Sequence, residues 1–140
     1  MPPISDRLRH AVEALPLSDG LRVLEIGCGP GVAARAVAAR IGSGKVVAID
    51  RSPTAIAQAT RGSGAEIASG LLEFRCVSIE DFELEKDEPP FDLAYAHRVG
   101  ALDGRHDGTR ARAALRRVLK PGGLLVIDDG PPIRVEDLDA

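Results

Sequence analysis

Three glycines at alternate positions, Gly27, Gly29 and Gly31, are the residues of this sequence with the clearest chemical meaning. They follow the aliphatic run 23–26 and precede the alanine-rich segment 32–41, which has the pattern of a helix. Glycines allow a sharp turn and let a ligand approach the backbone, and the N-terminus of the next helix offers unpaired N–H groups. The stretch therefore predicts a nucleotide-binding turn between a strand and a helix.

The spacing of the glycines separates the known kinds of nucleotide-binding turn. A dinucleotide site needs G-x-G-x-x-G, but here the third glycine comes one residue early, and no Gly-Lys-Ser/Thr of a phosphate-binding loop follows. Glu25 stands two residues before Gly27, so residues 25–31 read E-x-G-x-G-x-G. In this motif the sequence resembles the class I S-adenosylmethionine-dependent methyltransferases.

The resemblance implies S-adenosyl-L-methionine as cofactor and S-adenosyl-L-homocysteine as product. It implies that the turn holds the methionyl end of the cofactor, through Glu25, Gly27, Cys28, Gly29 and Gly31.

Asp50 ends the stretch 45–50, whose run of apolar residues predicts a second buried strand. A carboxylate at this point can accept both hydrogen bonds of a ribose diol. The resemblance assigns Asp50 to the ribose, and an ordinary strand-end residue is the alternative. Arg51 could cover the adenine face or be a solvated surface residue.

The turn after the third expected strand, 72–77, is the candidate adenine site. In the family this turn presents an aspartate to the adenine amine, followed by an apolar residue that packs on the ring. Ser78 stands at the aspartate position and Ile79 at the packing position. A serine accepts a hydrogen bond without charge assistance, so Glu80 or Asp81 is an alternative acceptor.

The fourth expected strand, 91–96, delivers Ala96, His97, Arg98 and Val99 to the ligand-binding edge of the sheet. Ala96 is assigned to the cofactor wall. His97 could act as a general base near neutral pH, or be a hydrogen-bonded strand-end residue. Arg98 could bind a carboxylate or phosphate of the substrate.

Acidic residues follow the fifth expected strand, 124–128. Asp128 and Asp129 could contact a cationic or amine substrate, or be solvated. A metal site is a further hypothesis, because one loop and its flank carry ligand types at His97, Asp103, His106 and Asp107. The glycines of this loop fix no geometry, so we expect no metal.

The elements that position these residues alternate between strands and helices, which predicts one α/β domain over residues 1–140. We expect a three-layer Rossmann-like sandwich with a mostly parallel sheet of about five strands, and the resemblance implies the order 3-2-1-4-5. A helix over 4–15 should pack beside the first strand. The family sheet usually ends in an antiparallel hairpin, for which the tail, 131–140, is too short. The fifth strand would then be a free edge, which predicts a homodimer or a covered edge.

The amino-acid composition limits the kinds of partner that the protein is expected to bind. The 140 residues carry 18 basic and 21 acidic side chains, a net charge of -3 that does not favour nucleic acid. No apolar run is long enough to span a membrane, and the two cysteines have no companions at zinc-ligand spacing. We expect a cytoplasmic protein with reduced thiols.

These observations predict a methyltransferase acting on a small-molecule acceptor of unknown identity. Two alternatives are a non-catalytic protein that binds S-adenosylmethionine or docks a partner, and an NAD-dependent oxidoreductase. The early third glycine argues against the oxidoreductase.

Overall fold

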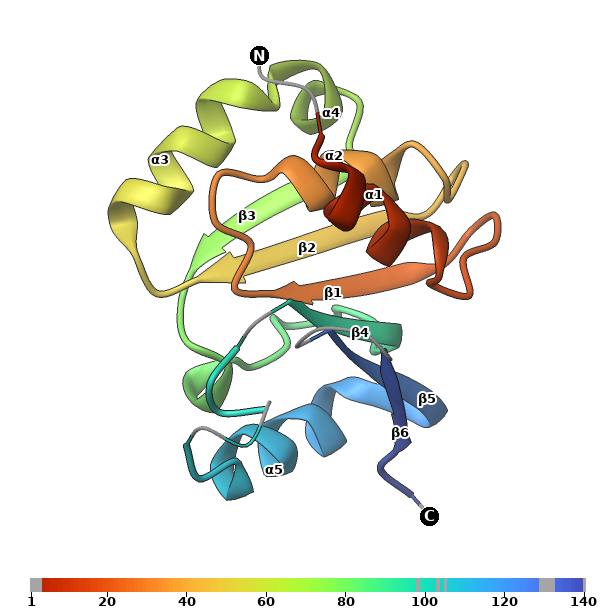
Figure 1. Ribbon diagram of the computed structural model, residues 1–140, viewed down its shortest axis with the longest axis vertical. Helices are drawn as coiled ribbons and strands as arrows, with labels where there is room; N and C mark the ends of the chain where they lie inside the picture. Colours follow the sequence, from red (N-terminus) through yellow and green to blue (C-terminus); the bar gives the residue numbers. More distant parts are fainter. Residues whose placement is uncertain (1–3, 98, 103, 105, 129–132, 140) are drawn as a thin grey trace.

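The computed structural model (Figure 1) describes residues 4–97, 99–102, 104, 106–128 and 133–139. One sheet of six strands has the order β3-β2-β1-β4-β5-β6. Strands β1 to β5 pair in parallel and β6 pairs antiparallel with β5. The strands are β1 Arg22–Ile26, β2 Lys45–Asp50, β3 Leu72–Cys76, β4 Phe91–His97, β5 Leu119–Asp128 and β6 Arg134–Asp137. The predicted Rossmann-like class and the order of the first five strands are confirmed.

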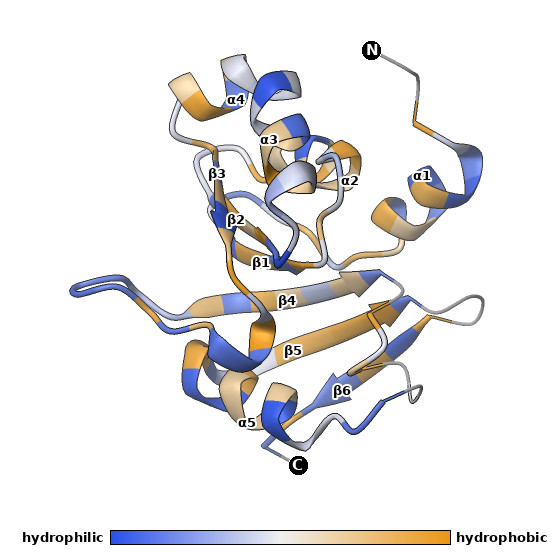
Figure 2. Ribbon diagram, turned by 90° about the vertical axis from the view of Figure 1, so that its left-hand side faces the viewer, coloured by the Kyte–Doolittle hydropathy of each residue, from blue (hydrophilic) through white to orange (hydrophobic). Residues whose placement is uncertain are grey.

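Two apolar cores lie on opposite faces of the sheet because successive strand residues alternate between the faces. Val23, Tyr95 and Val126 belong to the core shared with the helices α1 (Asp6–Glu13) and α2 (Val32–Ala38). Figure 2 shows β5 mainly in hydrophobic colours, whereas α1 and α5 alternate between hydrophilic and hydrophobic.

The other core joins the sheet to the opposite helical layer. Leu24, Ala94 and Leu125 pack there with residues of α5 (Thr109–Val118) and of the 3₁₀ turn η1 (Ile79–Asp81). Because both faces of the sheet are covered, β1, β2 and β4 are buried along most of their length. The three layers fix where the strand ends meet, and therefore where the site lies.

Helix caps set where the helices begin. The Ser5 hydroxyl accepts a hydrogen bond from the Leu8 amide at the start of α1, which is shorter than the predicted 4–15. Ser52 caps α3 (Pro53–Gly62) in the same way, and a short helix α4 (Gly64–Ala68) follows. Among the described residues no helix is long and apolar enough to cross a membrane.

The expectation that no strand follows β5 is wrong, and of the two predicted outcomes, a homodimer or a covered edge, the structure shows a covered edge. Residues 134–137 of the tail form β6, which pairs with Leu124 to Ile127 of β5. Arg112 of α5 holds β6 through Glu136, with Nη2 3.0 Å from Oε1 and Nε 3.2 Å from Oε2. Because the tail covers the edge, the reason for predicting a homodimer no longer applies.

Candidate functional site

The three glycines form a tight turn between β1 and α2. Gly27, Gly29 and Gly31 have φ angles of 73°, 54° and 88°, in the left-handed region that favours glycine. The amides of Gly27 and Cys28 both donate to the carbonyl of Ile49, at 2.9 and 3.0 Å. The turn is therefore fixed to the end of β2.

Two of these glycines are also required by space. A Cβ atom on Gly27 would lie 2.9 Å from Cγ2 of Val99, and one on Gly31 would lie 3.1 Å from both Ala59 and Phe74. At Gly29 nothing lies within 4 Å, so only its φ angle favours glycine there. The close approach of Val99 to Gly27 joins the loop after β4 to the glycine turn.

Asp50 is held in place at the carboxyl end of β2. Its Oδ2 atom accepts a hydrogen bond from the Gly29 amide at 3.0 Å, and Oδ1 accepts one from the Ser52 amide at 2.9 Å. A carboxylate offers about four acceptor positions, so capacity for a diol remains. The carboxylate is thus oriented by the turn that it stabilises.

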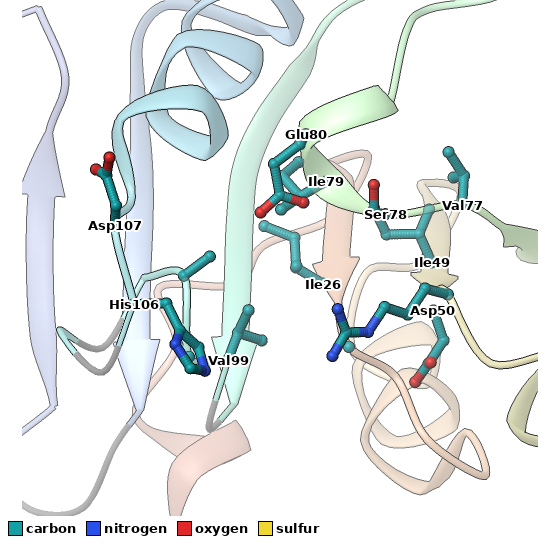
Figure 3. Close-up of a pocket in the computed structure, with 14 residues that line it drawn as sticks. Ile26, Ile49, Asp50, Val77, Ser78, Ile79, Glu80, Val99, His106 and Asp107 are labelled. Carbon is teal, nitrogen blue, oxygen red and sulfur yellow. The ribbon is translucent and has the colours of Figure 1, made fainter.

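A pocket of about 490 Å³ opens beside this turn. Its size is within the range of small-molecule sites. In Figure 3, His106 and Val99 lie on one side, Ser78, Ile49 and Asp50 lie on the other, and Glu80 lies between them. Of the predicted cofactor residues, those that line the pocket are Gly27, Asp50, Arg51, Ser78, Ile79 and Glu80.

The wall formed by residues 99–101 was predicted only in part. Val99, which the sequence places at the ligand-binding edge of the sheet, lines the pocket. Gly100 and Ala101 line it too, together with His106, whose amide donates to the Gly100 carbonyl at 2.9 Å. Gly100 and Ala101 were not predicted as ligand contacts, because their position depends on the path of the loop after β4.

The candidate adenine turn places Ser78 and Glu80 on the pocket wall. The Ser78 hydroxyl donates to Oδ2 of Asp81 at 3.2 Å. Glu80 forms no hydrogen bond with any residue that the structure describes. Glu80 is therefore a second acceptor at the pocket, whereas Asp81 is occupied by Ser78 and, at 3.4 Å, by Arg110.

Glu25 lies beneath the glycine turn and is 2% exposed. Neither carboxyl oxygen has a hydrogen-bond partner in the described part of the chain. Burial raises its pKa to about 8, with Asp50 raising it further and Arg35 opposing. Burial and the neighbouring carboxyl groups also raise the pKa of the Cys28 thiol to about 12, so this residue is no nucleophile.

The end of β4 presents His97 next to Asp128 of β5. Nδ1 of His97 lies 2.6 Å from Oδ2 of Asp128, whose other oxygen is 3.6 Å from Nη2 of Arg7 in α1. The two residues predicted separately as a base and a substrate contact thus form one pair. Ala96 is fully buried between its strand partners and does not line the pocket.

Some predicted residues cannot be placed. Arg98, Asp129 and Asp103 lie outside the described residues. Within the part of the chain that the structure describes, no three His, Cys, Asp or Glu side chains are grouped as metal ligands. The expectation of no metal stays a prediction.

Comparison with known proteins identifies the class of protein that has this fold and this glycine turn. The methyltransferase domain family matches residues 23–123, most of the chain. The chain belongs to this family, within the class I S-adenosylmethionine-dependent methyltransferases.

Two curated relatives and one solved structure illustrate the range of the family. The chain is 31% identical to trans-aconitate 2-methyltransferase of Methylobacterium nodulans over 127 residues, covering 87% of this chain and 44% of the relative. It is 36% identical to ubiquinone biosynthesis O-methyltransferase of Xylella fastidiosa over 122 residues, covering 86% and 46%. The structure of the [4+2]-cyclase SpnF is 32% identical, with a TM-score of 0.70, covering 87% and 43%. The chain spans less than half the length of each of these three proteins.

Proposed function

We propose that this chain binds S-adenosyl-L-methionine and transfers its methyl group to an oxygen nucleophile of a small-molecule acceptor. The observation that carries the proposal is Asp50, whose carboxylate is held by Gly29 and Ser52 at the edge of the pocket. That arrangement supplies a fixed acceptor for the ribose diol.

The residues of the chain fit this cofactor. The unpartnered carboxyl group of Glu25 lies beneath the turn that would hold the methionyl end, and can receive an ammonium group. Gly27 has no side chain where the backbone meets the pocket. Ile79 supplies an apolar wall for the adenine ring, and Ser78 or Glu80 supplies an acceptor for its amine.

Methyl transfer requires that the donor and the acceptor are aligned, and a hydroxyl acceptor also needs a base to remove its proton. When bound, the cofactor supplies a methyl group that its sulfonium already makes electrophilic. The Asp128 carboxylate accepts a hydrogen bond from Nδ1–H of His97, which leaves Nε2 to take the acceptor's proton. The glycine turn and Asp50 hold the donor while the acceptor is aligned.

The oxygen nucleophile is inferred from the relative named an O-methyltransferase of ubiquinone biosynthesis. The relative named for trans-aconitate adds carboxylic acids to the acceptors worth testing. Carboxylate and phenol acceptors are therefore the first to assay. The family also supports methyl transfer over the nicotinamide-dependent alternative. The second candidate function is binding of S-adenosylmethionine without methyl transfer. The similarity to SpnF, a protein named a cyclase, supports this candidate.

Calorimetry with S-adenosylhomocysteine tests the binding step. Wild type should bind this ligand, Asp50→Ala should bind at least tenfold more weakly, and Glu83→Ala, which removes an exposed carboxylate, should match wild type. Equal affinity for wild type and Asp50→Ala would remove the ribose assignment. Formation of S-adenosylhomocysteine from S-adenosylmethionine, measured with carboxylate and phenol acceptors, then separates transfer from binding alone.

A further inference from the structure

Glu25 and Tyr95 stand opposite each other on β1 and β4. Residues paired in this way point to the same face of a sheet, here the face covered by α1 and α2. Both side chains are buried, Glu25 at 2% and Tyr95 at 0% exposure. Among the residues that the structure describes, neither carboxyl oxygen of Glu25 nor the hydroxyl of Tyr95 has a hydrogen-bond partner. The sheet thus carries two adjacent buried polar groups that the fold itself does not satisfy.

The nearest cation does not neutralise Glu25. Arg35 of α2 is the basic residue that acts on it electrostatically. The Nη1 atom of Arg35 donates instead to the carbonyl of Pro30 at 3.1 Å and to the hydroxyl of Ser63 at 2.9 Å. A buried carboxylate without a direct partner carries a large desolvation cost.

The remaining groups that face this pair are mostly acidic. Asp50 of β2 raises the pKa of Glu25, and the Cys28 thiol of the turn faces the same carboxyl group. Burial, Glu25 and Asp128 of β5 raise the pKa of Tyr95, which Arg7 of α1 opposes. The surroundings therefore favour a proton on Glu25 until a cation arrives.

We propose that Glu25 is a neutral acid in the ligand-free protein and releases its proton when the ammonium group of the methionyl end binds beside it. The inference rests on the proposed function. The O–H bond of the Glu25 carboxyl group breaks, the proton passes to the solvent, and the resulting carboxylate pairs with the ammonium group.

Proton release makes binding depend on pH. Because one proton leaves for each ligand bound, the dissociation constant should rise about tenfold for each pH unit below the pKa of free Glu25, which is about 8. A ligand that lacks the ammonium group, such as 5′-methylthioadenosine, should bind without this dependence.

Calorimetry in buffers of different ionisation enthalpy measures how many protons are released when the ligand binds. At pH 6.5, S-adenosylhomocysteine should release close to one proton from wild type and from Tyr95→Phe, which keeps the titrating carboxyl group. Release from Glu25→Gln, and from wild type with 5′-methylthioadenosine, should be close to zero. Binding without proton release, or release that persists in Glu25→Gln, would overturn the inference and leave the proposed function intact. If S-adenosylhomocysteine did not bind at all, the proposed function and this inference would both be overturned.

Infrared difference spectroscopy checks the assignment without relying on affinity. The stretching band of a protonated carboxyl group should be lost when S-adenosylhomocysteine binds to wild type or to Tyr95→Phe. Loss of that band from wild type with 5′-methylthioadenosine would contradict the role of the ammonium group. Because Tyr95→Phe keeps the carboxyl group, it provides a second test should Glu25→Gln fail to fold.

Discussion

Nδ1 of His97 lies 2.6 Å from Oδ2 of Asp128, across the boundary between β4 and β5. The two residues are direct partners in the strand register, so the sheet itself fixes their separation. Asp128 is almost fully buried and His97 is 27% exposed, so the pair has one end in the core and one end at the surface. The imidazole is therefore partly exposed at the carboxyl end of β4, and His97 is not among the residues that line the pocket beside the glycine turn.

Replacing either member of the pair should slow methyl transfer while leaving cofactor affinity nearly unchanged. We expect His97→Gln to reduce kcat about 10²-fold with a hydroxyl acceptor, as for loss of a general base. Asp128→Asn should reduce kcat and alter the pH–rate profile, because an amide no longer holds the proton on Nδ1. The measurements are kcat across pH and the dissociation constant of S-adenosylhomocysteine. Unchanged kcat in His97→Gln would exclude the histidine as base.

A methyl group at position 27 should weaken nucleoside binding. In Gly27→Ala the new Cβ would lie 2.9 Å from Cγ2 of Val99, which lines the pocket, and the φ angle of 73° adds strain of about 1–2 kcal/mol. We expect at least a tenfold loss of affinity for S-adenosylhomocysteine by calorimetry. Gly122→Ala is the matched control, with a φ angle of 78° and nothing within 4 Å of its Cβ. It should lose similar stability and no affinity, and a similar loss of affinity in both variants would contradict the steric argument.

The parts of the fold predicted correctly from the sequence are those with strong local signals. The ends of β1 and β2 coincide with their predictions, because buried apolar runs there stop at the glycine turn and at Asp50. β5 begins at Leu119 rather than at 124, because Leu119 pairs with β4 ahead of a shift in register, although the proline and two glycines that follow it are typical of a turn. β6 was missed because its sequence, Arg-Val-Glu-Asp, has no strand pattern and becomes a strand only by pairing with β5.

The site residues that could be predicted are likewise those with a strong local signal in the sequence. Asp50 and Ser78 were found because each follows an expected strand, and both line the pocket. The pairing of His97 with Asp128 was missed, since only the register of β4 on β5 brings residues 31 positions apart together. The approach of Val99 to Gly27 depends on the path of the loop after β4, for which the sequence gives no signal.

Glu25 should make the stability of the ligand-free protein depend on pH. Its pKa in the fold is about 8 against an ordinary value of 4.5, so the folded state retains a proton that the unfolded chain has lost between these values. The free energy of unfolding should therefore fall as pH rises from about 5 to 8, by up to about 4 kcal/mol. Denaturant titrations at several pH values should show this fall in wild type and in the exposed variant Glu83→Gln, and its loss in Glu25→Gln. A fall that persists in Glu25→Gln would assign it to another group.

Removing the attachment of β6 should loosen both the sheet edge and the pocket wall. Glu136 receives two hydrogen bonds from Arg112, and the carbonyl of Leu102, next to Ala101 of the pocket wall, accepts from Arg112 at 3.5 Å and from Arg134 at 3.4 Å. We expect Glu136→Ala to lower the free energy of unfolding by about 1 kcal/mol, as for a half-buried bidentate pair.

Hydrogen exchange should report the local effect of Glu136→Ala. Backbone amides of Val135 and Val126, which face each other across β5 and β6, should exchange faster, and S-adenosylhomocysteine should bind a few-fold more weakly. Asp137→Ala is the matched control on the same strand, because within the described ranges the Asp137 side chain accepts only from the Asp139 amide. Equal exchange rates in the two variants would show that Arg112 and Glu136 do not hold β6, and that its pairing with β5 suffices.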